Sequence, residues 1–402
     1  MYDVLVVGGG LTGCLAALTA AAAGARVGLA QGGWGATAQA HGALELVRWR
    51  GEAANAGADQ HLASLCRGAA DHPLARLGPE RASAAMVAAM QRLERVLAPA
   101  SLAPSAWTPT AVAQHYADAG GDDLFAATAF APHVALPTSG VWGVLGPAPP
   151  ATGADWRPLA LPAGLRGEAV AVAQALDGEA ARALLAAELR PACAGLAGLL
   201  VPPLLGLAQP QVVRAELAAA LGLPVQELLA AAVPSLPGLR LMQALQAALQ
   251  AAGVQPLGRV LAATCVAGRL ASLSIAGASE PVRLGAAVLA SGRFLGGGLV
   301  LRGGLPHESL LDLPLDFMPE VEKVSLGAVP WAPQPLLEAG VVVNTDLQPV
   351  LASGEVAVTG LFVAGMLLAG HAGGHDGCAD GVVLATGQVA AEQALAAAGW
   401  ST

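Results

Sequence analysis

The chain has 402 residues, of which 55% are hydrophobic and only 12% are charged, and its formal net charge is −9 at pH 7. A chain of this length can form more than one lobe with a sizeable core, and its negative charge argues against nucleic-acid binding, which needs a basic face. The five cysteines are dispersed without a Cys-x-x-Cys pair, which indicates reduced thiols in a cytosolic protein and gives the chain no iron–sulfur ligand cluster of its own.

The apolar composition raises the question of a membrane-spanning segment. Residues 191–213 carry no charge, but Pro202, Pro203 and several glycines would leave backbone groups unsatisfied in lipid. Much of the apolar content is alanine, which is a weak membrane signal. We therefore do not expect the chain to insert into a bilayer.

The N-terminal residues predict a β-α-β unit. Residues 3–7 form a short apolar run typical of a buried parallel strand, and three glycines follow as a tight turn. Residues 11–23 predict an Ala/Leu helix that ends at Gly24, and residues 26–30 predict the second strand.

Helical spacing dominates residues 50–125, and prolines and glycines interrupt the pattern from 131 to 163. Residues 237–253 predict a further helix, and strand-like alternation with turns follows over residues 258–299. An apolar strand over residues 360–370 then leads into a glycine-rich loop and a helix over residues 382–398.

Gly8, Gly10 and Gly13 form a Gly-x-Gly-x-x-Gly motif after a strand and at the start of a helix. The first glycine permits the turn, the second lets the backbone approach a phosphate, and the third lets the helix pack closely on the sheet. The free N–H groups at the helix start, near Leu11 and Thr12, would face the phosphate. A purely structural glycine turn is the disfavoured alternative in this context.

Two later strand ends indicate which dinucleotide binds. One strand ends at Ser291-Gly292 and a second at Gly365, in an arrangement that resembles the flavoprotein form of the two-dinucleotide-binding, Rossmann-like α/β fold. Two acids of that pattern are missing. Gln31, followed by Gly32, stands where an acid usually holds the adenosine ribose, and Met366 stands where an acid usually contacts the flavin ribitol.

These departures fit one family. The segments VLVVGGGLTG, PSLPGLRLMQALQAALQAAG, AVLASGRFLGGGLV, WAPQPLLEAGVVVNTDLQPV and LFVAGMLLAGHAGGHDGCADGVVLATG resemble, in this order, the B subunit of anaerobic glycerol-3-phosphate dehydrogenase. That family also lacks both acids. The resemblance implies a flavin-containing subunit of a complex that oxidises glycerol 3-phosphate to glycerone phosphate and passes electrons to quinone.

The resemblance also implies partners and a location. A catalytic A-type flavoprotein subunit and an iron–sulfur C-type subunit that anchors the pair to the membrane would complete the complex. We expect a cytoplasmic protein that is attached, through a partner, to the inner face of the cell membrane. No nucleic acid and no metal ion is expected as a ligand.

The candidate catalytic residues are His371 and His375, in the glycine-rich loop near the expected flavin ring. A histidine there could take a proton from a substrate hydroxyl as hydride leaves for the flavin. The simpler interpretation, that both are polar loop residues next to the last helix, is favoured over it. Asp380 is expected to cap that helix.

Further flavin contacts are expected in two glycine-containing loops. The first follows the second strand and the other precedes the last helix, whose positive N-terminal end would face the flavin. The candidate residues are His41, Gly42, Gly377, Cys378 and Gly381. Cys378 is more often a small buried residue than a redox centre.

The identity of the flavin depends on Gln31. A charge-assisted hydrogen bond to the ribose would contribute about 1.5–3 kcal/mol, and Gln31 can accept a hydrogen bond only without the charge. The position of the phosphate site favours FAD, whereas the family is associated with FMN. We expect FAD and keep FMN as the alternative.

From these signals we divide the chain into a flavin-binding domain (residues 1–48 and 235–402) and an inserted α+β lobe (residues 49–234) that caps the site or faces a partner. Two other functions remain open at this point. One is a stand-alone flavin-dependent oxidoreductase of a small acid, and the other is a flavin-free structural subunit of the same fold.

Overall fold

The computed structural model describes residues 1–40, 43–49, 52, 56–98, 108–110, 124–128, 139–145, 154–227, 235–317, 335–372 and 377–400. Its contacts form two compact units. Unit 1 comprises Met1–Thr37, Glu45–Leu93 and Leu245–Thr402, and unit 2 comprises Ala38–Leu44 and Glu94–Ala244. Residues 49–93 therefore pack with unit 1, although the sequence patterns place them in the inserted lobe. The functional division into a flavin-binding domain and an inserted lobe stays a prediction.

Unit 1 is built around one mixed sheet with the strand order β10-β2-β1-β13-β12-β11, and β18 also pairs with β13. The parallel strands are β1 (Tyr2–Val7), β2 (Val27–Ala30), β10 (Gln255–Leu257), β13 (Val282–Leu289) and β18 (Leu361–Val363). The antiparallel strands are β11 (Val260–Val266) and β12 (Arg269–Ile275). The predicted β-α-β unit is therefore present, with β1 at the centre of the parallel strands.

Strand β1 occupies this central place because its side chains from Val4 onward are apolar and buried. Parallel strands covered on both faces need such continuous apolar runs. The carboxyl ends of β1, β13 and β18 lie at one edge of the sheet, since all three run parallel. In open α/β sheets this is the edge at which ligands bind.

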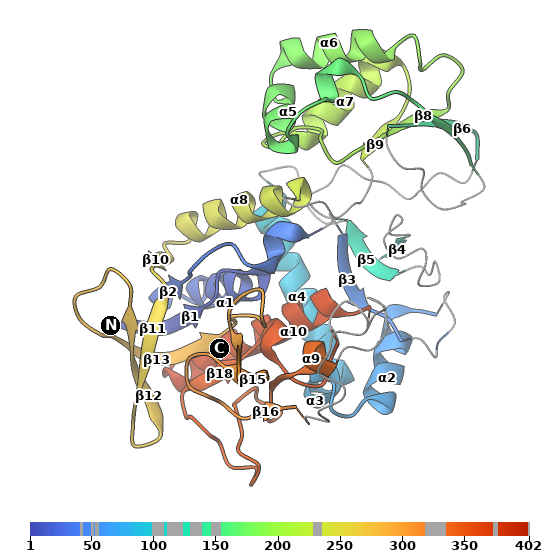
Figure 1. Cartoon of the computed structure of the whole chain (residues 1–402). Helices are drawn as coiled ribbons and strands as arrows, with labels where there is room; N and C mark the ends of the chain where they lie inside the picture. Colours follow the sequence, from blue (N-terminus) through green and yellow to red (C-terminus); the bar gives the residue numbers. More distant parts are fainter. Residues whose placement is uncertain are drawn as a thin grey trace. The chain divides into compact units, whose positions relative to one another are not determined.

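Two helices, α1 (Leu11–Ala22) and α10 (Ala379–Ala397), pack against each other and against the strands (Figure 1). Gly387 permits a close approach of the two helices, because it has no side chain where they cross. A Cβ added at this position would lie 3.1 Å from the carbonyl oxygen of Thr12, which is tighter than an ordinary van der Waals contact. The Thr19 hydroxyl donates to Gln388 Oε1 at 2.9 Å, which satisfies two buried polar groups between the helices. Helix α10 begins three residues before the predicted start, and β18 is shorter than the predicted strand because a 3₁₀ turn, η5 (Gly365–Leu367), follows it.

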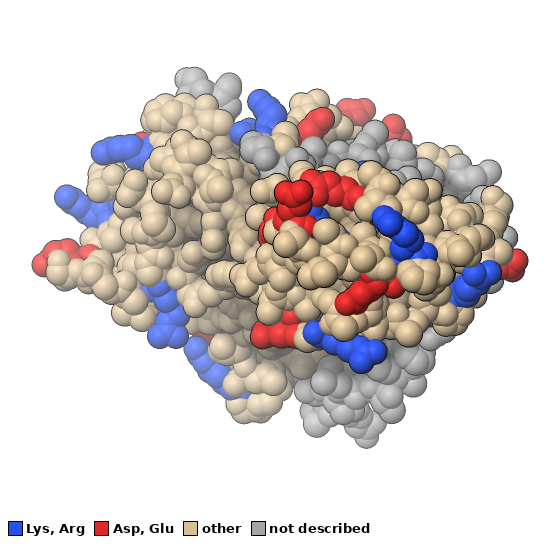
Figure 2. All heavy atoms as spheres, turned by 90° about the horizontal axis from the view of Figure 1, so that it is seen from above, with Lys and Arg blue, Asp and Glu red and all other residues tan. Residues whose placement is uncertain are grey.

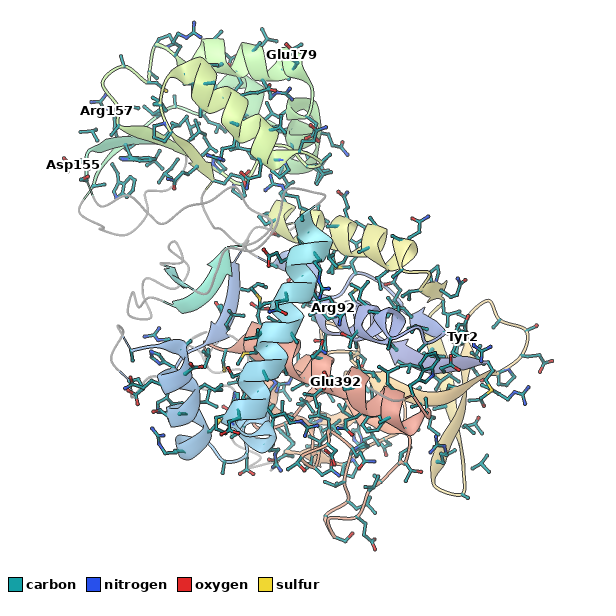
Figure 3. All side chains as sticks on the ribbon, turned by 180° about the vertical axis from the view of Figure 1, so that it is seen from behind. Tyr2, Arg92, Asp155, Arg157, Glu179 and Glu392 are labelled. Atoms are coloured by element: carbon teal, nitrogen blue, oxygen red, sulfur yellow. The ribbon has the colours of Figure 1, made fainter. Side chains whose placement is uncertain are left out.

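The rest of unit 1 covers the sheet and its edge. Figure 3 shows Arg92 on α4 and Glu392 on α10, and the Arg92 guanidinium donates to the carbonyl oxygen of Leu18 in α1 at 3.4 Å. The remaining elements with residues in unit 1 are η1 (Ala36–Gln39), β3 (Ala43–Val47), α2 (Ala58–Gly68), α3 (Pro73–Leu77), α4 (Pro79–Leu97), α8 (Leu236–Ala251), β14 (Leu299–Arg302), β15 (Leu305–Glu308), β16 (Leu315–Asp316), α9 (Pro335–Glu338) and β17 (Gly340–Val341).

Unit 2 contains a four-stranded parallel sheet in the order β7-β6-β8-β9. Its strands are β6 (Val141–Val144), β7 (Asp155–Pro158), β8 (Gly198–Val201) and β9 (Val225–Glu227), and a separate antiparallel pair is formed by β4 (Thr108–Thr110) and β5 (Leu124–Thr128). Its helices are η4 (Ala163–Leu165), α5 (Ala169–Leu176), α6 (Glu179–Leu189) and α7 (Pro210–Leu221). Leucine and valine side chains from these helices and strands form its core.

A buried ion pair joins β9 to α8 inside unit 2. Arg240 Nη1 lies 2.7 Å from Glu227 Oε2, and both side chains are fully buried. Arg240 Nε also donates to the carbonyl oxygen of Gly206. Some other charged side chains of unit 2 are exposed, and Figure 3 shows three of them, Asp155 and Arg157 on β7 and Glu179 at the start of α6.

The surface is sparsely charged, in keeping with the composition. On the face drawn in Figure 2, the coloured Lys and Arg side chains are scattered among broad areas of other residues and do not gather into one patch. Within the described ranges, no helix combines the length and apolar character that crossing a bilayer requires.

Candidate functional site

The glycine turn after β1 is as tight as the motif predicts. Gly8 has a φ of +114°, and a Cβ at this position would lie 2.2 Å from the carbonyl oxygen of Ala290 in the segment after β13. A Cβ on Gly13 would lie 1.9 Å from the carbonyl oxygen of Gly8. Only glycine fits at either position, so these two residues let α1 and the end of β13 approach the turn.

Gly10 has a different environment. It is the N-cap of α1 with extended backbone, and the nearest atom to a Cβ added there is Thr37 Oγ1, at 3.4 Å. The protein itself therefore has room for a side chain at Gly10. This open Cα face at a helix N-terminus is the kind of place where a backbone can approach a phosphate.

Thr37 belongs to this turn, although no sequence motif pointed to it. Its hydroxyl accepts a hydrogen bond from the Leu11 N–H at 2.8 Å, across 26 positions of sequence. It supplies a partner to one of the N–H groups that the start of a helix leaves unpaired. The loop after β2 thus returns to the start of α1.

Gln31 lies against the turn rather than apart from it. Its backbone N–H donates to the carbonyl oxygen of Leu257 at 3.2 Å. A Cβ added to Gly9 would lie only 2.0 Å from Gln31 Oε1 and would clash with it. A side chain at Gly9, which the sequence motif did not single out, would therefore displace the end of the Gln31 side chain. The neighbouring Gly32 packs on the Arg259 side chain, with its added Cβ 3.3 Å from the nearest carbon.

The end of β13 carries an orphaned polar atom. Among the described residues, Ser291 Oγ is buried and has no hydrogen-bond partner, and a Cβ on Gly298 would lie 2.4 Å from it. Gly292, with a φ of +70°, makes the turn that follows. A buried hydroxyl without a partner is uncommon, and a polar group of a ligand would satisfy it.

The end of β18 lies against the start of α1. Gly365 has a φ of +71°, and a Cβ there would lie 2.3 Å from Thr12 Oγ1. Its N–H donates to Thr386 Oγ1 at 2.8 Å, which ties it to α10. Met366 follows and is half-buried. The structure therefore brings the predicted residues at Gly8–Gly13, Ser291 and Gly365 to one edge of the sheet.

The N-terminus of α10 also reaches this edge, but Asp380 does not cap the helix as the sequence predicts. The N-cap is Cys378 without a side-chain cap, and Asp380 Oδ2 instead accepts the N–H of Glu45 in β3 at 2.8 Å. Gly381 faces the same strand, since its added Cβ would lie 1.7 Å from the carbonyl oxygen of Leu46. Gly377, with a φ of +64°, makes the turn before the helix.

His371 is buried, with 3% of its surface exposed, and its ring nitrogens have no side-chain hydrogen-bond partner among the described residues. Its ring packs edge-on against that of His72, with 5.9 Å between the centroids. His72 Nε2 lies 3.3 Å from Cys378 Sγ, and His72 Nδ1 accepts the N–H of Leu74. His72 was not predicted, because it stands far from the loop in sequence and only the fold brings it there.

Both histidines are neutral at pH 7. Burial lowers the pKa of His72 to about 4. Burial also holds the pKa of His371 well below its usual value, with the guanidinium of Arg293 and the ring of His72 as further causes. The two imidazoles beside Cys378 are therefore uncharged near neutral pH.

Some predicted residues are not part of this geometry. His375, His41 and Gly42 lie outside the described residues. Among the residues that are described, no three or more His, Cys, Asp or Glu side chains are grouped so that they could hold a metal ion.

The residues present fit a flavin dinucleotide. The open Cα face of Gly10 at the start of α1 suits a pyrophosphate, and the orphaned Ser291 hydroxyl suits a polar group of the ligand. When bound, FAD supplies an acceptor for two electrons as a hydride.

The family model described as "FAD binding domain" matches residues 3–141. The B subunit of anaerobic glycerol-3-phosphate dehydrogenase from Yersinia enterocolitica is 38% identical over 117 residues, which are 29% of this chain and 27% of that protein. The same-named protein of Actinobacillus pleuropneumoniae is 35% identical over 120 residues, 28% of this chain and 27% of that one. The aligned segment thus spans about a quarter of the length of these relatives. A flavocytochrome c3 fumarate reductase in its open conformation is 12% identical, with 99% of this chain and 78% of that chain covered and a TM-score of 0.49.

These matches confirm two predictions. The chain carries an FAD-binding flavoprotein fold, and FAD is the flavin that the matching family binds, so FMN is the minor alternative. The resemblance to the dehydrogenase's B subunit is also confirmed over the aligned segment.

Proposed function

We propose that the chain is the flavin-containing oxidoreductase subunit of an anaerobic-type glycerol-3-phosphate dehydrogenase complex. In this role it takes part in the oxidation of glycerol 3-phosphate to glycerone phosphate, with electrons passed on to quinone. The observation that carries the proposal is the similarity to proteins named as the B subunit of that dehydrogenase, at 35–38% identity. The FAD-binding turn and strand ends support it independently.

The proposed partners are a catalytic A-type flavoprotein subunit and an iron–sulfur C-type subunit that anchors the complex to the membrane. The relatives are themselves named as one subunit of a larger enzyme, which supports the existence of partners. The dispersed cysteines of this chain support the assignment of iron–sulfur clusters to another subunit. A cytoplasmic location at the inner face of the membrane belongs to the same proposal.

Within the chain, the proposed roles follow from position. Gly8, Gly10 and Gly13, with the N–H of Thr12, hold the pyrophosphate at the start of α1, whereas the Leu11 N–H is already bonded to the Thr37 hydroxyl. A second group holds the ribitol and ring by backbone and hydroxyl contacts, and it consists of Ser291, Gly292, Gly365 and Met366. The N-terminal end of α10, at Gly377, Cys378 and Gly381, stabilises negative charge near it.

His371 has the protonation state that a proton acceptor needs. Burial keeps it neutral, and among the described residues no side chain forms a hydrogen bond with its ring nitrogens. A neutral imidazole at the flavin site can accept a hydrogen bond, and then the proton, from a substrate hydroxyl. His375 stays a second candidate for this role.

The test is to purify the chain alone and together with co-expressed A-type and C-type subunits. We expect the chain alone to bind FAD and to oxidise glycerol 3-phosphate slowly or not at all, because a separate catalytic subunit is proposed. We expect the complex to pass electrons to a quinone analogue. Turnover by the chain alone at the rate of the complex, or of a different small acid, would favour a stand-alone oxidoreductase. A colourless chain that does not bind added FAD would favour a structural subunit.

A further inference from the structure

Arg293 stands directly after Ser291-Gly292, at the carboxyl end of β13, and only 8% of its surface is exposed. Its guanidinium donates to three backbone carbonyl oxygens. Nη2 lies 2.9 Å from the oxygen of Leu368 and 2.7 Å from that of His371, and Nη1 donates to the oxygen of Leu337 in α9. One side chain therefore joins the end of β13, the end of α9 and the loop after η5.

The geometry of the donor matters here. Arginine offers five N–H donors in a planar, fixed fork, whereas lysine offers three rotatable donors at a single point. The fork bonds to the carbonyl oxygens of Leu368, His371 and Leu337 from two nitrogens held in one plane, a spacing that the single ammonium nitrogen of lysine does not reproduce.

The loop that Arg293 fastens carries His371, whose ring nitrogens have no side-chain hydrogen-bond partner among the described residues. The position of this imidazole therefore depends on the backbone that carries it and on packing. The hydrogen bond from Arg293 to the His371 carbonyl fixes the backbone, and packing against His72 fixes the ring.

The titratable and charged groups that face His371 disfavour a positive charge on it. Among the described residues they are the Arg293 guanidinium and the neutral ring of His72, which in turn contacts Cys378 Sγ. The backbone of Gly365 acts in the opposite direction and is the weakest of the causes. A second positive charge beside a guanidinium in a buried site would be strongly unfavourable.

We propose that Arg293 is a positioning residue, which fixes the loop bearing His371 and thereby presents a neutral imidazole to the flavin site. The use of that imidazole as a proton acceptor rests on the proposed function, whereas the positioning does not. Arg293 itself touches backbone and is not a catalytic residue.

The test compares Arg293→Lys, which keeps the charge without the fork, with Arg293→Gln, which removes both. Arg92→Gln is the matched control, because Arg92 also donates to a buried backbone carbonyl of unit 1, that of Leu18, away from His371. The full chain is loaded with FAD. Hydrogen–deuterium exchange follows the amides of residues 368–372, and NMR of labelled histidine follows protonation of His371, assigned with a His371→Gln sample.

We expect Arg293→Lys to speed exchange in the loop by about tenfold or more, the effect of losing charge-assisted hydrogen bonds, while His371 stays neutral to the same pH. In Arg293→Gln the loop should exchange faster and His371 should become protonated at a higher pH than in the wild type, because the neighbouring positive charge is gone. Arg92→Gln should change neither.

The proposal is overturned if Arg293→Gln leaves both readouts unchanged, or if Arg92→Gln changes them equally. Should Arg293→Gln fail to fold, the exchange rates of Arg293→Lys decide: faster exchange supports the proposal and unchanged exchange overturns it. Absence of glycerol 3-phosphate oxidation by the complex assembled with the A-type and C-type subunits, together with the expected shifts, would refute the proposed function and leave the positioning role standing.

Discussion

The change Gly10→Val separates the binding of FAD from the stability of the fold. Gly10 is an N-cap with φ −77° and ψ −179°, which are values that valine adopts without strain, and its added Cβ meets only Thr37 Oγ1 at 3.4 Å. Valine is a poorer N-cap than glycine. We therefore expect the free energy of unfolding of the FAD-free protein to fall by only about 1 kcal/mol.

The effect on FAD should be larger. The valine methyl groups occupy the space through which a pyrophosphate reaches the N–H groups at the start of α1. A hydrogen bond to a charged group contributes about 1.5–3 kcal/mol, so losing two of them costs roughly 3–6 kcal/mol. At 1.4 kcal/mol for each factor of ten, the Kd for FAD should rise by about 100-fold or more.

The assay is a titration of FAD-free protein with FAD, followed by the change in flavin fluorescence, with urea unfolding of the same samples. Gly57→Val is the matched control, because Gly57 is the N-cap of α2 with φ −71° and ψ 156° and no atom lies within 4 Å of its added Cβ. It should lose similar stability and keep wild-type affinity. Wild-type affinity in Gly10→Val would refute the placement of the phosphate at α1.

Three further outcomes are expected. Gln31→Glu should tighten FAD by about tenfold or more and leave FMN unaffected, if a carboxylate reaches the adenosine ribose; equal changes for both flavins, measured by titration, would contradict this. Gly377→Asp places a carboxylate just before α10, at a φ of +64° that aspartate tolerates. This negative charge should lower the midpoint potential of the flavin, which is measured by equilibration with a redox dye. An unchanged potential with FAD bound would argue against a flavin near this end of the helix. His72 has a folded-state pKa of about 4, below its ordinary value of 6.5, so the free energy of unfolding should fall by about 3 kcal/mol as the pH drops from 6.5 towards 4. Urea unfolding of His72→Gln should show a smaller loss of stability over this pH range. An equal loss in His72→Gln and in the wild type would assign the acid sensitivity to other groups.

Local spacing in the sequence predicted one part of the site. Gly8, Gly10 and Gly13 are encoded by a strand, a turn and a helix in immediate succession, so their roles follow from the backbone of a β-α-β unit. Ser291 and Gly365 are predictable for the same reason, since each closes an apolar parallel strand and such ends share one edge.

Contacts across the fold defined the other part, and spacing could not reveal them. Thr37 reaches Leu11, and His72 reaches both Cys378 and His371, only because loops from different elements meet at the edge. The helix cap expected at Asp380 was wrong for the same reason: a carboxylate in a first helical turn has several N–H groups in reach, and here the N–H of Glu45 is bonded.

The pairing of β1 has a consequence for how the protein is made. Tyr2 pairs with Leu284, so the central strand leaves the ribosome some 280 residues before its neighbour β13. At a synthesis rate of about 5–20 residues per second, β1 and the glycine turn wait for tens of seconds with one side of the sheet missing. The hydroxyl of Ser291 and the turn at Gly365 arrive later still. Cofactor loading is therefore a late event in biogenesis, and the nascent N-terminal half must be shielded from aggregation until then.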